Sequence, residues 1–234
     1  MLLALLLEQS KGVLFVIFEL KKSRANPKGA CYVSENKAYL YKKGGKVMIE
    51  YEARVLEVNK DELEKKLKSL GAEKIADFNY RRRVYDFNPR SDGKWIRLRT
   101  DGNKTTLTLK EIKSKEIDGT IENEIEVSDF DATDIILNKL GYKAHTYQEN
   151  KRTRYLLDGV EIDIDTWPYI PTYVEIEGKS TKQVKEMIKK LGFDQNKVTS
   201  IDVQEVFKQY YNIDIAKMEE VRFGQTLDEK FIIK

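Results

Sequence analysis

Cysteine and histidine are nearly absent from this sequence. Its 234 residues include one cysteine, Cys31, and one histidine, His145. A single cysteine excludes an internal disulfide framework and a multi-cysteine zinc site, and a single histidine excludes catalytic schemes that need two. Any chemistry must therefore use carboxylates, lysines, arginines, tyrosines and water.

Long apolar runs and a strong charge imbalance are also lacking. Residues 2–7 and 13–18 are apolar, but charged and polar side chains at 8–11 interrupt them. A membrane-spanning helix needs about 20 mostly apolar residues, so we expect no transmembrane span. The net charge is only +3, which does not favour a strongly basic nucleic-acid-binding protein. We therefore expect a cytoplasmic protein that binds no nucleic acid.

The first 47 residues differ in composition from the rest. They contain nine Lys and Arg residues against three Glu, and Lys21–Lys46 is lysine-rich with scattered Gly, Asn and Ser. Such a composition is typical of a linker. We predict a domain over residues 48–212 and a C-terminal tail over 213–234. Residues 1–47 would be an extension, either a membrane-surface anchor or an over-extended translation start.

Charged residues are plentiful, at 35%, and many recur at every second position. Glu50, Glu52 and Arg54 would share one face of a strand, because side chains alternate with a period of two. One such strand would simply be a solvent-facing strand. The pattern returns, however, in further same-face sets: Glu122, Glu124 and Glu126; Glu175 and Glu177; Arg97 and Arg99; Arg152 and Arg154; Asp163 and Asp165.

Amphipathic helices are predicted after three of these charged strands, and each ends in Leu-Gly. The first begins at Asn59 with capping-box spacing and ends at Gly71. The third begins at Ser180 or Thr181 and ends at Gly192. Their apolar stripes must pack on another element, and the uncharged face of a sheet is the obvious partner.

The second helix is predicted to begin at Asp131 or Thr133 and to end at Gly141, with Ile136 and Leu140 facing inward. A fourth apolar stripe around Val203–Phe207 resembles a helix, and the following pair Tyr210-Tyr211 is interpreted as C-terminal packing.

Strand-like stretches joined by tight turns occupy the remainder. Asp101-Gly102 and Asp158-Gly159 mark hairpins, which join antiparallel strands. Helices on the apolar face would leave the charged face to line an interior, and closure into a barrel removes exposed edges. We predict an α+β fold, a closed antiparallel eight-stranded β-barrel with a charged interior and helices outside. Beyond Met48–Val55, the expected strands are 80–87, 94–100, 105–110, 121–127, 152–157, 160–166 and 172–176.

Mixed charge inside a barrel indicates a charged ligand. Paired carboxylates make hard oxygen sites suited to Mg²⁺ or Mn²⁺. Arginine and lysine suit phosphate oxygens, and arginine can bind two at once. Acidic and basic walls in one cavity therefore fit a metal–triphosphate complex better than a bare polyanion.

These residues also resemble a known family. Glu50-x-Glu52-x-Arg54 is similar to the Glu-x-Glu-x-Lys signature of the CYTH family, the triphosphate tunnel metalloenzymes. The resemblance spans roughly Met48 to Tyr211 and continues through an ordered series: Arg97-Leu-Arg99, Thr108-Leu-Lys110, Glu122-x-Glu124-x-Glu126, Lys151-Arg152, Asp165 and Tyr173-Val-Glu175-Ile-Glu177.

The resemblance implies roles for individual residues. The implied ligands of Mg²⁺ or Mn²⁺ are Glu50, Glu52, Glu175 and Glu177, with Glu124 and Glu126 as second-tier candidates. The implied phosphate-binding residues are Arg54, Arg97, Arg99, Lys110, Lys151 and Arg152. The implied catalytic residues are Arg54, Lys110, Arg152 and Asp165. For each of these, a structural ion pair inside the barrel is the alternative interpretation.

The family includes class IV adenylate cyclases, thiamine triphosphatases and inorganic triphosphatases. The resemblance therefore implies a metal-dependent enzyme that acts on a triphosphate such as ATP, tripolyphosphate or thiamine triphosphate. The pattern most resembles the adenylate cyclase branch, which converts ATP to cyclic AMP and pyrophosphate. Phosphate release by a triphosphatase and non-catalytic triphosphate or polyphosphate binding remain alternatives, and a homodimer is compatible with the sequence.

Two positions depart from the family pattern. Arg54 stands where a lysine is expected, and Arg83 stands where an acid is expected. Trp95 and Trp167 flank the charged strands, and either could stack on a base or pack in the core. His145 is interpreted as a surface or packing residue, and Cys31 as a bystander in the extension.

Overall fold

The computed structural model describes residues 2–9, 12–19, 38–42, 45–87, 89–194 and 197–233, and it describes side chains only from Ile49 onward. Strands β1 (Leu2–Gln9), β2 (Gly12–Glu19) and β3 (Ala38–Lys42) pair in order, and β3 pairs with the start of β4 (Gly45–Val55). Part of the predicted linker therefore forms strands. Cys31 lies outside the described residues.

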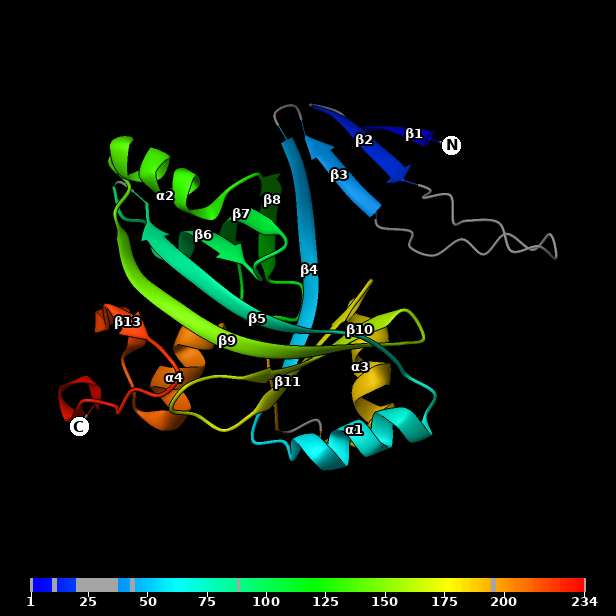
Figure 1. Ribbon diagram of the computed structural model, residues 1–234. Helices are drawn as coiled ribbons and strands as arrows, with labels where there is room; N and C mark the ends of the chain where they lie inside the picture. Colours follow the sequence, from blue (N-terminus) through cyan, green and yellow to red (C-terminus); the bar gives the residue numbers. More distant parts are fainter. Residues whose placement is uncertain are drawn as a thin grey trace.

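Eight strands close into an antiparallel barrel, as predicted (Figure 1). Their order is β4, β11, β10, β9, β5, β6, β7 and β8. Closure comes from β4, which pairs with β11 near its end and with β8 through Met48–Glu50. The other seven strands are β5 (Glu73–Asp86), β6 (Lys94–Thr100), β7 (Thr105–Ile112), β8 (Thr120–Val127), β9 (Ala144–Leu157), β10 (Val160–Thr166) and β11 (Tyr173–Gly178).

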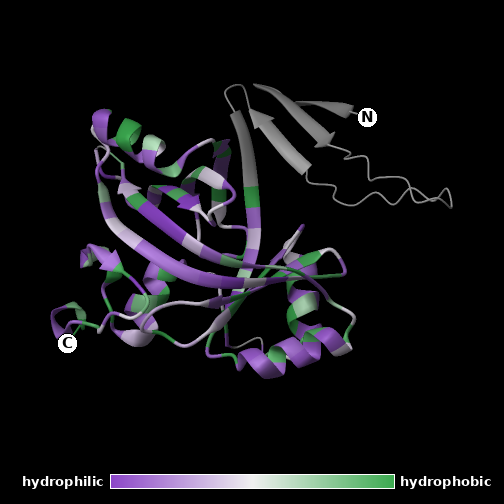
Figure 2. Cartoon of the chain, viewed as in Figure 1, coloured by the Kyte–Doolittle hydropathy of each residue, from purple (hydrophilic) through white to green (hydrophobic). Residues whose placement is uncertain are grey.

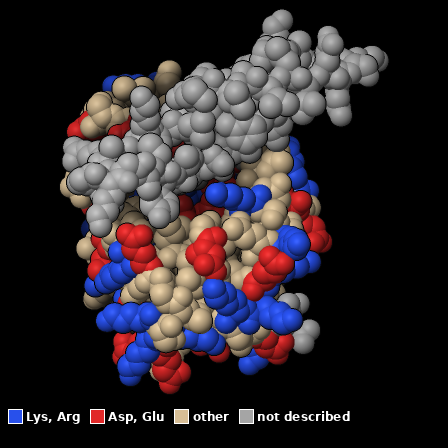
Figure 3. Space-filling view, turned by 90° about the vertical axis from the view of Figure 1, so that its right-hand side faces the viewer, with Lys and Arg blue, Asp and Glu red and all other residues tan. Residues whose placement is uncertain are grey.

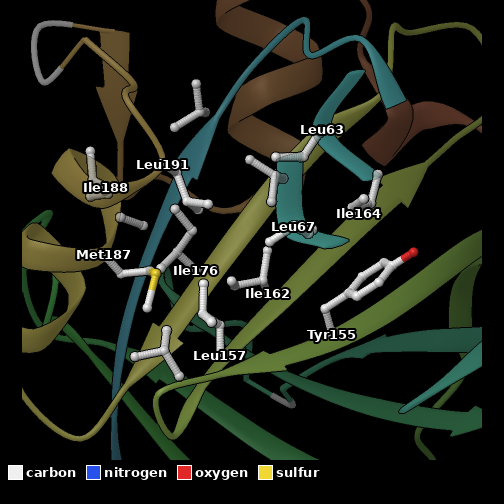
Figure 4. Packing of buried hydrophobic residues seen from close by; sticks show 14 of the residues in the cluster. Leu63, Leu67, Tyr155, Leu157, Ile162, Ile164, Ile176, Met187, Ile188 and Leu191 are labelled. Atoms are coloured by element: carbon white, nitrogen blue, oxygen red, sulfur yellow. The ribbon is translucent and has the colours of Figure 1, made fainter. Parts of the chain in front are cut away.

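Two helices cover the outer face of β4, β10 and β11. They are α1 (Lys60–Ser69) and α3 (Thr181–Lys190), which begin after the predicted cap residues Asn59 and Ser180. Leu67 of α1 and Ile188 of α3 belong to one buried cluster with Ile162 and neighbouring strand residues, and Leu67 lies beside Ile162 (Figure 4). Each such side chain stabilises the fold by roughly 1.5–3 kcal/mol, so this layer holds the barrel wall in place.

Helix α2 (Phe130–Lys139) packs on the barrel through a different face from the one predicted. Its cap is Asp129, which precedes both predicted starts, Asp131 and Thr133. Ile136 and Leu140 are 59% and 69% exposed. Phe130 and Leu137 are buried instead. The face that α2 turns inward consists of Phe130, Asp134 and Leu137, at positions i, i+4 and i+7. The middle residue of this face is polar.

That middle residue, Asp134, explains the error. Its carboxylate accepts a hydrogen bond of 2.7 Å from the Tyr85 hydroxyl on β5. A polar residue in an inward stripe breaks the apolar periodicity on which the prediction depended.

The C-terminal segment forms a second core. Helix α4 (Val203–Tyr211) contributes Val206 and Phe207, and Ile215 and Met218 pack with them. Tyr210 is 54% exposed, so its predicted packing role is wrong, whereas Tyr211 is partly buried in this cluster. Short elements among the described residues are β12 (Val198–Thr199), paired with β4, and β13 (Glu220–Val221), parallel to β9. The 3₁₀ turns η2 (Ile215–Lys217) and η3 (Glu229–Phe231) follow α4.

Hydrophilic residues run along barrel strands such as β5 and β9 (Figure 2). On the outside, basic and acidic side chains are interspersed over the face seen in Figure 3. None of the helices in the described part of the chain is both long and apolar enough to cross a membrane.

Candidate active site

Charged side chains point into a cavity of about 530 Å³ inside the barrel. They come from every barrel strand, because each strand turns alternate residues inward. We call this cavity the tunnel. Its charged lining includes Glu50, Glu52, Arg54, Arg82, Arg97, Arg99, Lys110, Glu122, Glu124, Arg152, Arg154, Glu161, Glu175 and Glu177.

Arg54 joins two carboxylates of the tunnel. Its Nε donates to Glu175 at 2.7 Å, and its guanidinium also donates to Glu52 at 2.9 Å and to the Ile201 carbonyl oxygen at 2.6 Å. Burial opposes the charge of Arg54, but Glu175 and Glu52 outweigh it and raise the pKa. A lysine, with one nitrogen, could not span these three acceptors from a single plane.

Arg152 lies among three carboxylates of β10 and β11. It donates to Asp163 at 2.6 Å, to Asp165 at 2.8 Å and to Glu175 at 2.5 Å. Burial raises the pKa of Asp165 to about 6, against the opposing effect of Arg152. Asp165 is 1% exposed and lies behind Arg152, so it orients that guanidinium.

Glu175 is shared by both arginines. Burial alone would raise its pKa, but Arg54 and Arg152 outweigh burial and lower it well below the usual range. Both carboxylate oxygens of Glu175 accept hydrogen bonds from guanidinium groups.

Lys110 and Arg97 face the carboxylates of β4 and β8. Lys110 Nζ lies 3.1 Å from Glu50 and also pairs with Glu122. Burial lowers the pKa of Lys110. Arg97 has longer contacts, 3.6 Å to Glu124 and 3.8 Å to Glu122. Lys110 is therefore held closely, whereas Arg97 is held loosely.

Three of the expected site residues do not line the tunnel: Lys151, Glu126 and Asp165, the last of which is buried behind Arg152. Lys151 is exposed on the outer face of β9, 4.9 Å from the ring centre of Phe223, because it alternates with Arg152. Glu126 lies at the end of β8, where its 66% exposed side chain pairs with Lys104 at 3.2 Å.

Sequence reasoning did not assign Arg82, Arg154 or Glu161, which also line the tunnel. Arg82 stands between Arg81 and Arg83 on β5, and alternation alone does not say which of the three faces the tunnel. Arg81 and Arg83 point outward, where Arg83 Nε lies 3.1 Å from Asp134. The arginine found where an acid was expected is therefore on the outside of the barrel.

The carboxylates suit a divalent metal by chemistry. Glu50, Glu52, Glu175 and Glu177 supply only oxygen donors, which Mg²⁺ and Mn²⁺ prefer. Burial raises the pKa of Glu52, and Arg54 opposes this effect. The negative charges of Glu50 and Glu175 raise the pKa further, and a bound cation would relieve the repulsion among the three carboxylates. In the described chain, no three acidic, histidine or cysteine residues already form a metal-binding cluster.

Comparison with known families identifies this arrangement. The CYTH domain model matches residues 48–206, more than half of the chain. The chain belongs to the CYTH family. These enzymes bind triphosphates and generally depend on divalent metals.

Solved structures agree with the CYTH barrel fold. A conserved hypothetical protein of Pyrococcus furiosus is 24% identical, with a TM-score of 0.60 over 67% of this chain and 98% of that one. A "putative adenylate cyclase" from Vibrio parahaemolyticus is 14% identical, with a TM-score of 0.60 over 69% and 98%. At such identities the likeness shows the fold alone. No curated protein sequence matches the chain.

Proposed function

We propose that this CYTH protein is a divalent-metal-dependent enzyme that converts ATP to cyclic AMP and pyrophosphate, as class IV adenylate cyclases do. The observation that carries triphosphate binding is the poor pairing of Arg97 and Arg99. Arg97 has only long contacts, and Arg99 contacts the ring of Tyr80 without a hydrogen bond to any other described residue. Both are partly buried, and cations shielded from water without close counter-charges favour an anionic ligand.

The residues have complementary roles in this proposal. Arg97, Arg99 and Lys110 would bind the phosphates and stabilise negative charge on the departing pyrophosphate. Glu50, Glu52, Glu175 and Glu177 would hold Mg²⁺ or Mn²⁺, which supplies charge neutralisation and Lewis acidity at the phosphates. Arg54 and Arg152 would hold the carboxylates in place, and Asp165 would position Arg152.

Trp95 favours a nucleotide as the substrate. It lies on the same face of β6 as Arg97 and Arg99 and lines the tunnel. A flat indole beside a phosphate site can stack on a base. Cyclisation would form the bond from the ribose 3′-oxygen to the α-phosphorus, with the 3′-hydroxyl proton passing to water. It would break the bond from the α-phosphorus to the bridging oxygen, which leaves with pyrophosphate.

Phosphate release from tripolyphosphate or thiamine triphosphate is the second candidate. Trp167 favours this candidate, because its side chain is 3% exposed and its ring packs edge-to-face on Phe207, with 5.9 Å between the ring centres. That indole is not free to sandwich a base opposite Trp95.

The test supplies ATP, tripolyphosphate and thiamine triphosphate with Mg²⁺ or Mn²⁺, and quantifies cyclic AMP, pyrophosphate and phosphate. Cyclic AMP with equimolar pyrophosphate is the expected result. Phosphate without cyclic AMP would instead establish a triphosphatase. Binding without turnover of any of the three would refute an enzymatic role.

A further inference from the structure

Arg82 is a tunnel cation to which the proposed function gives no role. It is 6% exposed, and its guanidinium lies 4.7 Å from the ring centre of Trp167. It donates a hydrogen bond to the neutral side chain of Asn150. It forms no ion pair with any described carboxylate, and its Nε has no hydrogen-bond partner among the described residues.

The surroundings of Arg82 are electrostatically unfavourable for a cation. Burial and the positive charges of Arg97 and Arg99 together lower its pKa to about 9. A buried charge without a counter-ion is costly for the folded state. Asp165 is the one negative charge that opposes this effect, and it does not pair directly with Arg82. The free Nε and the neutral partner Asn150 therefore indicate room for a further negative charge beside Arg82.

Trp167 provides a second unused donor beside Arg82. It lines the same tunnel, and its buried Nε1 has no hydrogen-bond partner among the described residues. Gln148, the β9 neighbour of Arg82 in the strand register, is also buried and lines the tunnel. An indole N–H and a guanidinium only donate, so the matching ligand is an oxygen-rich anion.

The chain also fixes the position of this pair. Asn150 accepts from Arg82 and donates to Asp165 at 3.1 Å, which connects Arg82 to the network around Arg152. Trp167 packs on Phe207 of α4, so the C-terminal core supports the indole. A pair that is held on both sides can act as a preformed binding site.

We propose that Arg82 and Trp167 form an additional phosphoryl subsite next to Arg97 and Arg99, at the part of the tunnel that the C-terminal core supports. The subsite extends the cationic surface of β6 to β5, and it would take a phosphoryl group at one end of the bound triphosphate. This inference rests on the proposed triphosphate site, and it adds a specific contact to that site.

The test is calorimetric titration of the full chain with inorganic tripolyphosphate and with pyrophosphate, in the presence of Mg²⁺. Losing a charge-assisted hydrogen bond in Arg82→Gln should weaken tripolyphosphate binding by about ten- to one-hundred-fold. Pyrophosphate, which is shorter, should lose less. Trp167→Phe keeps the ring and removes the N–H, so it should weaken binding by a smaller factor.

Arg83→Gln is the matched control, because Arg83 is on the same strand but points outward to Asp134. It should bind tripolyphosphate within about twofold of the wild type, as expected for a surface pair. Without ligand, Arg82→Gln should melt at the same temperature as the wild type or higher, and it should show a smaller shift on adding tripolyphosphate. A merely structural Arg82 would give a lower melting temperature instead.

Wild-type affinity in Arg82→Gln, or a loss no larger than in Arg83→Gln, would overturn the subsite. If circular dichroism shows that Arg82→Gln is unfolded, Arg82→Lys and Trp167→Phe replace it in the titration. Wild-type affinity for tripolyphosphate in both of these variants would overturn the subsite. Binding that depends on Arg82 without any turnover would support the subsite and refute the enzyme. Turnover that is the same in Arg82→Gln as in the wild type would support the enzyme and overturn the subsite.

Discussion

The two sides of the tunnel are paired to different degrees. On the inner faces of β4, β9, β10 and β11, which we call the paired wall, Arg54 and Arg152 each contact two or more carboxylates at hydrogen-bond distance. On the inner faces of β5 and β6, the open wall, Arg82 and Arg99 have no ion pair with a described carboxylate. The paired wall is stabilised by its own charges, whereas the open wall needs an anion from outside.

This difference separates structural charge from charge available for binding. Both walls carry charged residues at alternate positions of the sequence, and both are built by the same alternation. A saturated arginine can orient carboxylates, but it has few donors left for a ligand. The predictions below break or sharpen this distinction.

The largest effect is expected from Glu175→Gln on the paired wall. It leaves Arg54 and Arg152 without a shared counter-ion, and breaking a buried pair costs about 3–5 kcal/mol of unfolding free energy. Metal-dependent turnover should fall at least about a hundredfold, because a carboxylate ligand is lost as well. Urea unfolding and a product assay measure the two effects. Unchanged activity would show that Glu175 is only structural.

On the open wall, Arg99→Gln should act in the opposite way. Affinity for the triphosphate should fall by about ten- to one-hundred-fold, since a charge-assisted contact is removed. Stability without ligand should stay equal or increase, because an unpaired cation has gone. Titration and thermal melting of the same preparations measure both. A large loss of stability would mean that the two walls do not differ.

Acid should weaken the paired wall through Glu175. Its pKa is lowered in the folded state by Arg54 and Arg152, which overcome burial. The folded state therefore binds fewer protons than the unfolded one, and this stabilisation is present above pH 4.5 and lost as the pH falls below it. The unfolding free energy of the wild type should decrease more steeply below pH 4.5 than that of Glu175→Gln. Parallel curves would contradict the assignment.

The smallest effect is expected from Lys151→Ala. Lys151 was predicted to bind phosphate, but its side chain is exposed on the outer face of β9. Surface charges contribute little, so triphosphate affinity should stay within about twofold of the wild type. A tenfold loss would favour the sequence-based role over the position in the barrel.

Much of the fold followed from local patterns. The caps Asn59 and Ser180, the Leu-Gly helix ends and the alternating strands all depend on interactions within a few residues. Helix α2 was harder, because Asp134 occupies an inward position that becomes favourable only through Tyr85 and Arg83, which are far away in the sequence.

The sequence by itself determined the period-two charge pattern, the barrel and most residues of its interior, since alternation is a local property of the chain. Only the tertiary structure decided which charges neutralise one another. Lys151 and Arg152 are neighbours, yet one is outside and the other lies among three carboxylates. Arg81, Arg82 and Arg83 look alike in the sequence, but strand register turns Arg82 alone toward the tunnel. Pairing depends on contacts across strands distant in sequence, so no local pattern could reveal that Arg82 and Arg99 are left without a carboxylate.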